Sequence, residues 1–167
     1  MWEKIRRAFR RSGKKLEIAK LMITYGLSVN EMEEILCGTL RIPHTSAAKA
    51  CDTDRRTVKE TVRTILGDPE LREFYRNLEP AGSSLKRVSR LMGYRCLTIE
   101  TTKDQPGIIA GVSSSLAKRN INIVQIVAED PNLYPQPRLY IIVSGDVPGE
   151  ALTEILQQPV IKSLTIS

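Results

Sequence analysis

The chain has 167 residues, of which 41% are hydrophobic and 26% are charged. These values fit one ordinary globular domain or two small ones, and they exclude a disordered tail. No apolar run is long enough to span a membrane, and the basic residues 1–15 lack the apolar stretch of a signal peptide. Cys37, Cys51 and Cys96 match no CxxC or zinc-site spacing, so we expect reduced thiols in a cytoplasmic protein without metal or cofactor.

The net charge of +6 is spread unevenly along the chain. Residues 1–95 contain 20 Lys and Arg against 12 Asp and Glu, a net of +8. Residues 96–167 contain 5 against 7, a net of −2. This split favours a basic half that binds a polyanion and an acidic half with another task.

Residues 1–80 predict an all-α domain, because apolar residues recur at spacings of three and four. We expect helices over 2–11, 15–25, 45–51 and 55–66, and another that starts at Pro69. Ser28 to Glu31 reads as a capping box before a further helix that ends at Gly38. Residues 81–93 predict a linker, which follows Pro80 and begins Ala-Gly-Ser-Ser, with a short helix expected within 85–93.

The stretch 46–66 fits a helix-turn-helix. Ala47, Ala48 and Ala50 supply small residues where the second helix packs closely, and Asp52 tolerates the left-handed turn conformation. Asp54 is a suitable N-cap for the second helix. The predicted DNA-binding residues on its outward face are Arg55, Arg56, Thr57, Lys59 and Arg63.

A helical hairpin with a solvated basic face is the alternative interpretation of the same stretch. The seven basic residues among the first fifteen favour DNA, since they can hold phosphates, but they also suit a solubilising helix. His44, the single histidine, reads as a phosphate contact or as a surface or capping residue.

Residues 94–167 predict the order β-α-β-β-α-β. CLTIETT alternates like a strand, GIIAGVSSSLAKR has helical spacing, and INIVQIVA and RLYIIVS are rich in β-branched residues. GEALTEILQQ is helical again, and VIKSLTIS is a last strand. This order is the split βαβ, or ferredoxin-like, pattern.

The corner KDQPGII joins the first strand of this pattern to its first helix. The amides of Gly107, Ile108 and Ile109 lack intrahelical partners there, and the helix dipole adds positive potential. The corner can therefore hold a carboxylate, while Asp104 can hold an ammonium group. A free α-amino acid carries both charges.

This motif and the following I-N-I resemble an ACT domain over residues 94–167, a ferredoxin-like module that senses amino acids. With the helix-turn-helix in front, the chain resembles archaeal predicted regulators of amino acid metabolism. The resemblance implies that an effector binds where two domains meet in a homodimer or tetramer. It also implies the effector-binding residues Thr102, Asp104, Gln105, Pro106, Gly107, Ile108, Ile109 and, across the dimer, Asn122. Many ACT domains serve only dimerisation, and this alternative stays open.

The sequence thus predicts an α+β chain: a helix-turn-helix domain over 1–80, a linker over 81–93 and an ACT-like domain over 94–167. The expected function is an amino-acid-responsive transcriptional regulator that binds DNA. The alternative is a regulatory or assembly subunit of an amino-acid metabolic enzyme. We do not expect an enzyme, because there is no P-loop, no nucleotide fingerprint and one histidine only.

Overall fold

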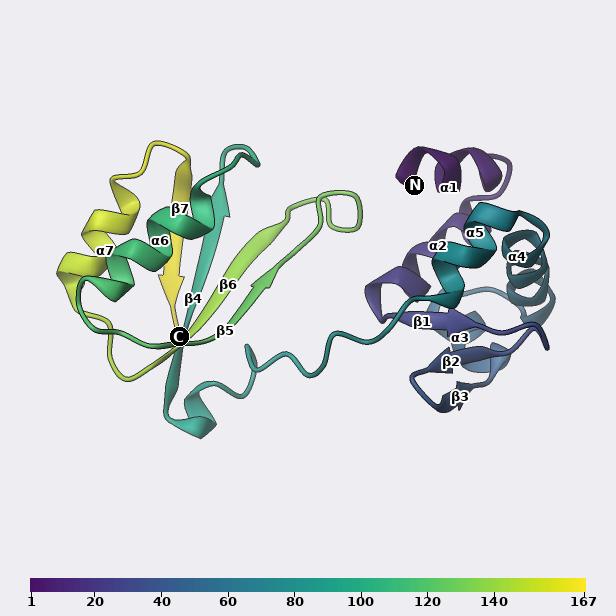
Figure 1. The fold of residues 1–167 in the computed structure, drawn as a ribbon, viewed down its shortest axis with the longest axis horizontal. Helices are drawn as coiled ribbons and strands as arrows, with labels where there is room; N and C mark the ends of the chain where they lie inside the picture. Colours follow the sequence, from purple (N-terminus) through teal and green to yellow (C-terminus); the bar gives the residue numbers. More distant parts are fainter. The chain divides into compact units, whose positions relative to one another are not determined.

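Two hydrophobic cores form along the chain, one on each side of Gly82. The computed structural model describes residues 1–167, and its two compact units are Met1–Gly82 and Ser83–Ser167 (Figure 1). Residues 83–93, predicted as linker, lie in the second unit. No helix combines the length and the apolar character that crossing a membrane requires.

The division at Gly82 changes the charge balance. Residues 1–82 contain 16 Lys and Arg against 12 Asp and Glu, a net of +4, and residues 83–167 contain 9 against 7, a net of +2. The predicted contrast between a basic and an acidic half therefore does not coincide with the two units, because Lys86, Arg87, Arg90 and Arg95 belong to the second.

The first unit combines five helices with a small sheet. Its helices are α1 (Trp2–Ala8), α2 (Gly13–Thr24), α3 (His44–Ala50), α4 (Arg55–Gly67) and α5 (Pro69–Arg76). Its strands β1 (Leu27–Val29), β2 (Ile35–Cys37) and β3 (Leu40–Ile42) pair antiparallel in that order. The core surrounds the fully buried Tyr75, whose hydroxyl donates a hydrogen bond to the Ala19 carbonyl (3.2 Å).

The prediction of an all-α first domain is wrong, because residues 27–42 form a sheet. The apparent capping box at Ser28 is part of β1, and the turn after it is held by Asn30. The Asn30 side chain accepts hydrogen bonds from the amides of Met32 (3.1 Å) and Glu34 (3.0 Å). An Asn side chain that accepts hydrogen bonds from the following backbone amides competes with helix formation, and here these bonds stabilise a turn. Gly38, predicted as a helix terminator, lies in the tight turn between β2 and β3.

Helices α3 and α4 lie within one residue of the helices predicted over 45–51 and 55–66. Ala47 and Ala48 are buried, whereas Ala50 is exposed. Asp52 has a left-handed φ of 47°, as expected for the turn residue. The Asp54 carboxylate caps α4 by accepting from the Thr57 amide (2.7 Å), and this hydrogen bond is the main cause that lowers the pKa of Asp54.

The end of the first unit packs against Gly26. This glycine has a φ of 61°, and a Cβ there would lie 2.3 Å from the carbonyl oxygen of Glu79. Only glycine allows the backbone of Glu79 and Pro80 to pass so close. The chain is therefore held to the first unit as far as Pro80.

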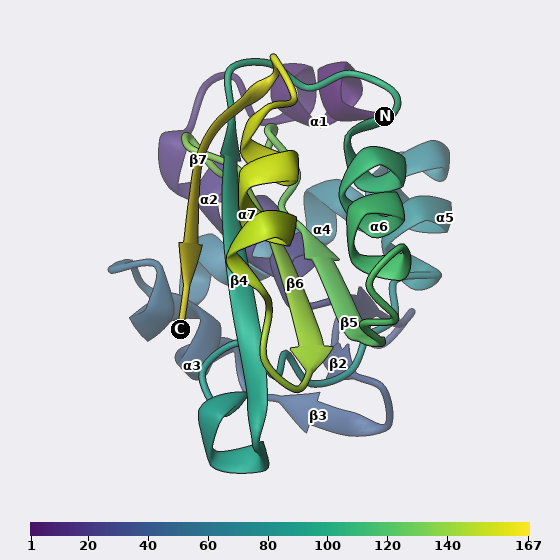
Figure 2. The ribbon, with the colours of Figure 1, turned by 90° about the vertical axis from the view of Figure 1, so that its left-hand side faces the viewer.

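The second unit has the predicted order of strands and helices. The elements are β4 (Tyr94–Thr101), α6 (Ile108–Ala117), β5 (Ile123–Ala128), β6 (Arg138–Ser144), α7 (Gly149–Leu156) and β7 (Ile161–Ile166), after a 3₁₀ turn, η1 (Arg90–Met92). The sheet is antiparallel, with the strand order β5-β6-β4-β7. Both helices cover one face of the sheet (Figure 2), and their apolar sides complete the second core.

The other face of the sheet is crossed by residues 83–89, which we call the strap. The Gln125 side chain holds it at two points: its Nε2 donates to the Ser83 carbonyl, and its Oε1 accepts from the Leu85 amide, both at 2.8 Å. The Lys86 ammonium lies 4.2 Å from the centre of the Tyr140 ring and 3.5 Å from the Glu129 carboxylate. The strap is therefore a fixed part of the second unit.

Candidate functional site

A pocket of about 420 Å³ lies where α6 begins, and we call it the α6 pocket. One wall is the loop between β4 and α6, and the other is the end of β5 with the start of β6. Its lining residues are Thr101, Asp104–Ala110, Ala128–Pro131 and Pro137–Leu139. Two segments that are distant in the sequence, before and after β5, thus enclose one hollow.

The wall formed by α6 offers free hydrogen-bond donors. Gly107, at a left-handed φ of 97°, precedes the helix, and no side chain caps it. The first intrahelical bond of this turn runs from the Gly111 amide to the Gly107 carbonyl (2.8 Å), which leaves the preceding three amides without helical partners. Such a helix start favours an anion, and a carboxylate group fits the requirement.

Carboxylates line both walls of the pocket. Asp104 belongs to the β4–α6 loop, whereas Glu129 and Asp130 lie on the opposite wall together with Arg138. Glu129 accepts a hydrogen bond from the Arg138 amide (3.1 Å) and pairs with Lys86 of the strap. The Arg138 guanidinium in turn pairs with Glu100 (2.8 Å). The pocket therefore combines free amide donors with carboxylates and one guanidinium, a set of groups suited to a small dipolar molecule.

Most predicted effector-binding residues line this pocket, and two do not. Asp104, Gln105, Pro106, Gly107, Ile108 and Ile109 all line it. Thr102 instead donates from its hydroxyl to the Val160 carbonyl (3.3 Å) and borders a neighbouring hollow of about 330 Å³. Asn122 precedes β5, whereas the pocket lies at the other end of that strand, about six residues or 20 Å away.

Glu129 and Arg138 were not predicted from the sequence. The loop that joins them contains three prolines, at positions 131, 135 and 137. The charged residues at both ends of that loop were the available signal. They reach the α6 pocket because β5 and β6 pair and return the chain to the same end of the sheet.

The predicted DNA-binding residues all lie on α4, and most already have partners. Arg56 pairs with Glu60 (3.0 Å), whereas Arg63 (2.8 Å) and Lys59 (3.7 Å) both pair with Glu33 from the β1–β2 turn. The hydroxyl of Thr57 donates to the Asp54 cap (3.2 Å). Arg55 is exposed and has no ion-pair partner. The basic face of α4 is thus partly neutralised by the protein itself.

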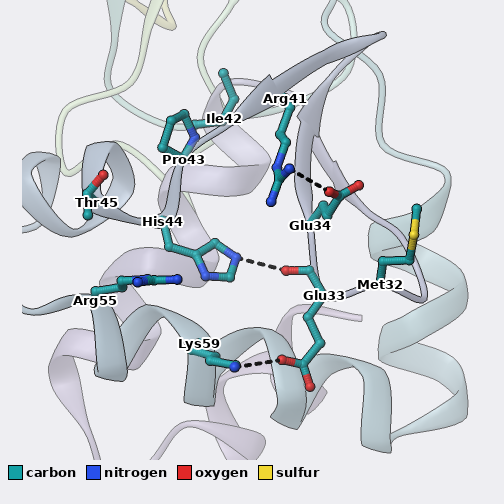
Figure 3. A pocket seen from close by; sticks show the side chains of 10 residues that line it. All are labelled: Met32, Glu33, Glu34, Arg41, Ile42, Pro43, His44, Thr45, Arg55 and Lys59. Carbon is teal, nitrogen blue, oxygen red and sulfur yellow. Dashed lines mark hydrogen bonds and ion pairs between the residues drawn. The ribbon is translucent and has the colours of Figure 1, made fainter.

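A second pocket, of about 600 Å³, lies beside the start of α4, and we call it the α4 pocket. Its lining residues are Met32, Glu33, Glu34, Arg41, Ile42, Pro43, His44, Thr45, Arg55 and Lys59 (Figure 3). The β1–β2 turn forms one wall, and α4 forms another. His44 does not cap a helix with its side chain: its Nε2 lies 2.8 Å from the Glu33 carbonyl oxygen.

No protein-family model matches the chain, and no curated protein does. Among solved structures, the ligand-free regulatory subunit of aspartate kinase from Thermus thermophilus is similar with a TM-score of 0.38 and 24% identity, over 45% of this chain and 51% of that chain. The chain thus spans about half the length of that subunit. A protein named PH0061 is similar with a TM-score of 0.27 and 10% identity, over 93% of this chain and 89% of that one. Both TM-scores are below 0.5, so these likenesses carry no argument about function.

Proposed function

We propose that the chain is an amino-acid-responsive regulator without enzymatic activity, and that its second unit is a ferredoxin-like, ACT-type domain. The α6 pocket would hold a free amino acid. The observation that carries this proposal is the α6 pocket itself, which is lined by free helix amides and by the carboxylates of Asp104, Glu129 and Asp130. Its volume of about 420 Å³ lies in the range of small-molecule sites.

In the proposed complex, the ligand carboxylate accepts from the amides of Ile108, Ile109 and Ala110, and the ammonium group lies against Asp104. These two contacts orient the ligand, and its side chain points to the apolar wall near Leu139. In an assembly of several chains, Asn122 of a neighbouring chain and Thr102 are the further residues that would contact the ligand.

A thermal-shift series against the twenty amino acids tests this site. A ligand that binds only the folded state raises the melting temperature with concentration. We expect one amino acid, or a few related ones, to do so, and Asp104→Ala to reduce the affinity about tenfold or more. Asp146→Ala, which removes a carboxylate that pairs only with Arg95, is the matched control. No shift with any amino acid would leave assembly as the role of this unit.

We further propose that α3 and α4 are a helix-turn-helix and that α4 enters the major groove of DNA. The support is local: the buried Ala47 and Ala48, the left-handed Asp52, and the exposed Arg55 and Arg56 at the start of a capped helix. Arginines there can bond guanine edges or phosphates.

Retention on immobilised genomic DNA at low salt tests this second proposal. We expect the wild-type chain to bind. The double change Arg55→Ala and Arg56→Ala is expected to weaken binding about tenfold or more, because phosphate contacts are lost. Each lost contact should also reduce the slope of log affinity against log salt concentration by about one. Arg72→Ala removes an exposed arginine of α5 and is the control. Equal binding by both variants would contradict a recognition role for α4.

The alternative function is a regulatory or assembly subunit of an amino-acid metabolic enzyme. The observation that favours it is apolar exposure on the edge strands: Val124 and Ile126 of β5 and Ile166 of β7 are each more than a third exposed. Unpaired strand edges of this kind are suited to pairing with another chain. A stable complex with an enzyme in pull-downs, insensitive to changes at Arg55, would favour this function.

A further inference from the structure

The α4 pocket is built around the β1–β2 turn, and Glu33 is the residue that closes this turn over α4. Glu33 has a left-handed φ of 61°, which few residues other than glycine adopt without support. Its backbone carbonyl accepts a hydrogen bond from His44 (2.8 Å), and its carboxylate accepts from Arg63 (2.8 Å). Glu33 is thus held at both its backbone and its side chain.

The Glu33 carboxylate is an anion that lies against basic side chains of α4. It lies 2.8 Å from the Arg63 guanidinium and 3.7 Å from the Lys59 ammonium. The hydrogen bond from Arg63 is the main cause that lowers the pKa of Glu33. Glu33 therefore stays negative, and it pairs with Lys59 and Arg63, two cations that the proposed recognition helix would otherwise offer to DNA.

Arg55 and Arg41 supply cations on the other side of the same pocket. Arg55 extends toward the His44 ring and has no carboxylate partner, whereas Arg41 pairs with Glu34 (3.0 Å) and is 72% exposed (Figure 3). A phosphate group beside the His44 ring would meet the free guanidinium of Arg55, and Arg41 adds to the pocket lining a second cation that is held only by an exposed ion pair. Exposed ion pairs contribute little to stability, so their exchange for a phosphate costs the fold little.

We propose that the α4 pocket is a phosphate-binding site for nucleic acid, in which Arg55 is the first contact and Glu33 is displaced from Lys59 and Arg63 by the incoming backbone. This proposal rests on the proposed DNA binding of α4. Glu33 then acts as an internal competitor: it keeps the basic face occupied until a polyanion replaces it. The β1–β2 turn thereby sets how strongly the chain binds DNA.

Binding of a fluorescein-labelled DNA duplex, followed by anisotropy at low salt, tests the competition. Glu33→Gln keeps the shape of the side chain and removes its charge. We expect it to bind about tenfold more tightly than wild type and with a steeper salt dependence, because Lys59 and Arg63 are then free to contact phosphates. Arg55→Ala is expected to bind about tenfold more weakly.

Glu31→Gln is the matched control for this experiment. Glu31 lies in the same turn, is 79% exposed and pairs only with Arg76 (3.5 Å), so its change removes the same charge without touching α4. An affinity gain with Glu33→Gln no larger than that with Glu31→Gln would overturn the competition by Glu33. Absence of DNA binding by wild type and Glu33→Gln alike would instead overturn the proposed DNA function.

His44 provides an independent readout, because it is the only histidine and it lines the pocket. Its ring resonances can be followed by NMR at constant pH while the duplex, or inorganic phosphate, is added. We expect both to shift the His44 signals of wild type, and about tenfold more of each to be needed for the same shift in Arg55→Ala. DNA binding without a His44 shift would overturn the pocket as the site while leaving DNA binding intact. If inorganic phosphate shifts the His44 signals and the duplex does not, the pocket is a site for the free ion and the nucleic-acid assignment is overturned.

Discussion

At the scale of single residues, Glu154 is the best-connected carboxylate of the second unit. It accepts hydrogen bonds from the Lys118 ammonium (2.8 Å), the Arg119 guanidinium (2.6 Å) and the Ser115 hydroxyl (3.1 Å). The bond from Lys118, followed by that from Arg119, lowers the pKa of Glu154 to about 2. These contacts join α7 to α6, the helix whose start lines the α6 pocket.

Glu154→Gln tests this network through its pH dependence. A carboxyl whose pKa is lower in the folded state stabilises the fold above its unfolded pKa, near 4.5, and loses this effect as the pH falls toward 2. Wild type is therefore expected to be more stable than the variant at pH 7, with a gap that narrows steadily below pH 4.5. Urea unfolding at pH 7, 4 and 3 measures it. Glu150→Gln, on the same helix and without an ion-pair partner, should show no such trend.

At the scale of elements, the longer strands and helices could be predicted from the sequence, whereas the shortest strands could not. The strands and helices of the second unit are six to ten residues long, and their hydrophobic periods of two and 3.6 are readable. Strands β1, β2 and β3 have three residues each, too few to show alternation. The α6 pocket was predictable on the side of the Pro-Gly corner, which is local in sequence, but not on the side of Glu129 and Arg138, which depends on strand pairing.

The strap is the element whose attachment depends most on one side chain, that of Gln125. Gln125→Ala removes both hydrogen bonds to Ser83 and Leu85, each of which contributes about 0.5–1.5 kcal/mol. We expect local release of the strap, with trypsin cleavage after Lys86 and Arg87 about tenfold faster and faster hydrogen exchange at the Leu85 amide. The rest of the second unit should keep its protection.

Gln157→Ala, a change of an exposed glutamine after α7, serves as the comparison for this experiment. Cleavage after Lys86 at the wild-type rate in Gln125→Ala would show that the contacts of Lys86 with Tyr140 and Glu129 are sufficient to hold the strap.

At the scale of the whole molecule, the division at Gly82 falls within the predicted linker, but the contacts around it could not be read from the sequence. Pro80, Gly82 and the two serines after it are typical of a flexible linker, and composition alone favours thirteen linker residues over 81–93. The contacts that shorten it are non-local. Gly26 meets Glu79 more than fifty residues later in the chain, and Gln125 meets Ser83 about forty residues earlier.

These two attachments leave Ala81 and Gly82 as the only residues between the anchored ends of the chain. Both are exposed, and Gly82 has a φ of 93°, a backbone conformation that other residues rarely adopt. The connection is therefore a two-residue linker with about four rotatable backbone dihedrals, and not a long flexible linker. Loss of the two hydrogen bonds between Gln125 and the strap would therefore lengthen this connection by the residues that they now hold to the sheet.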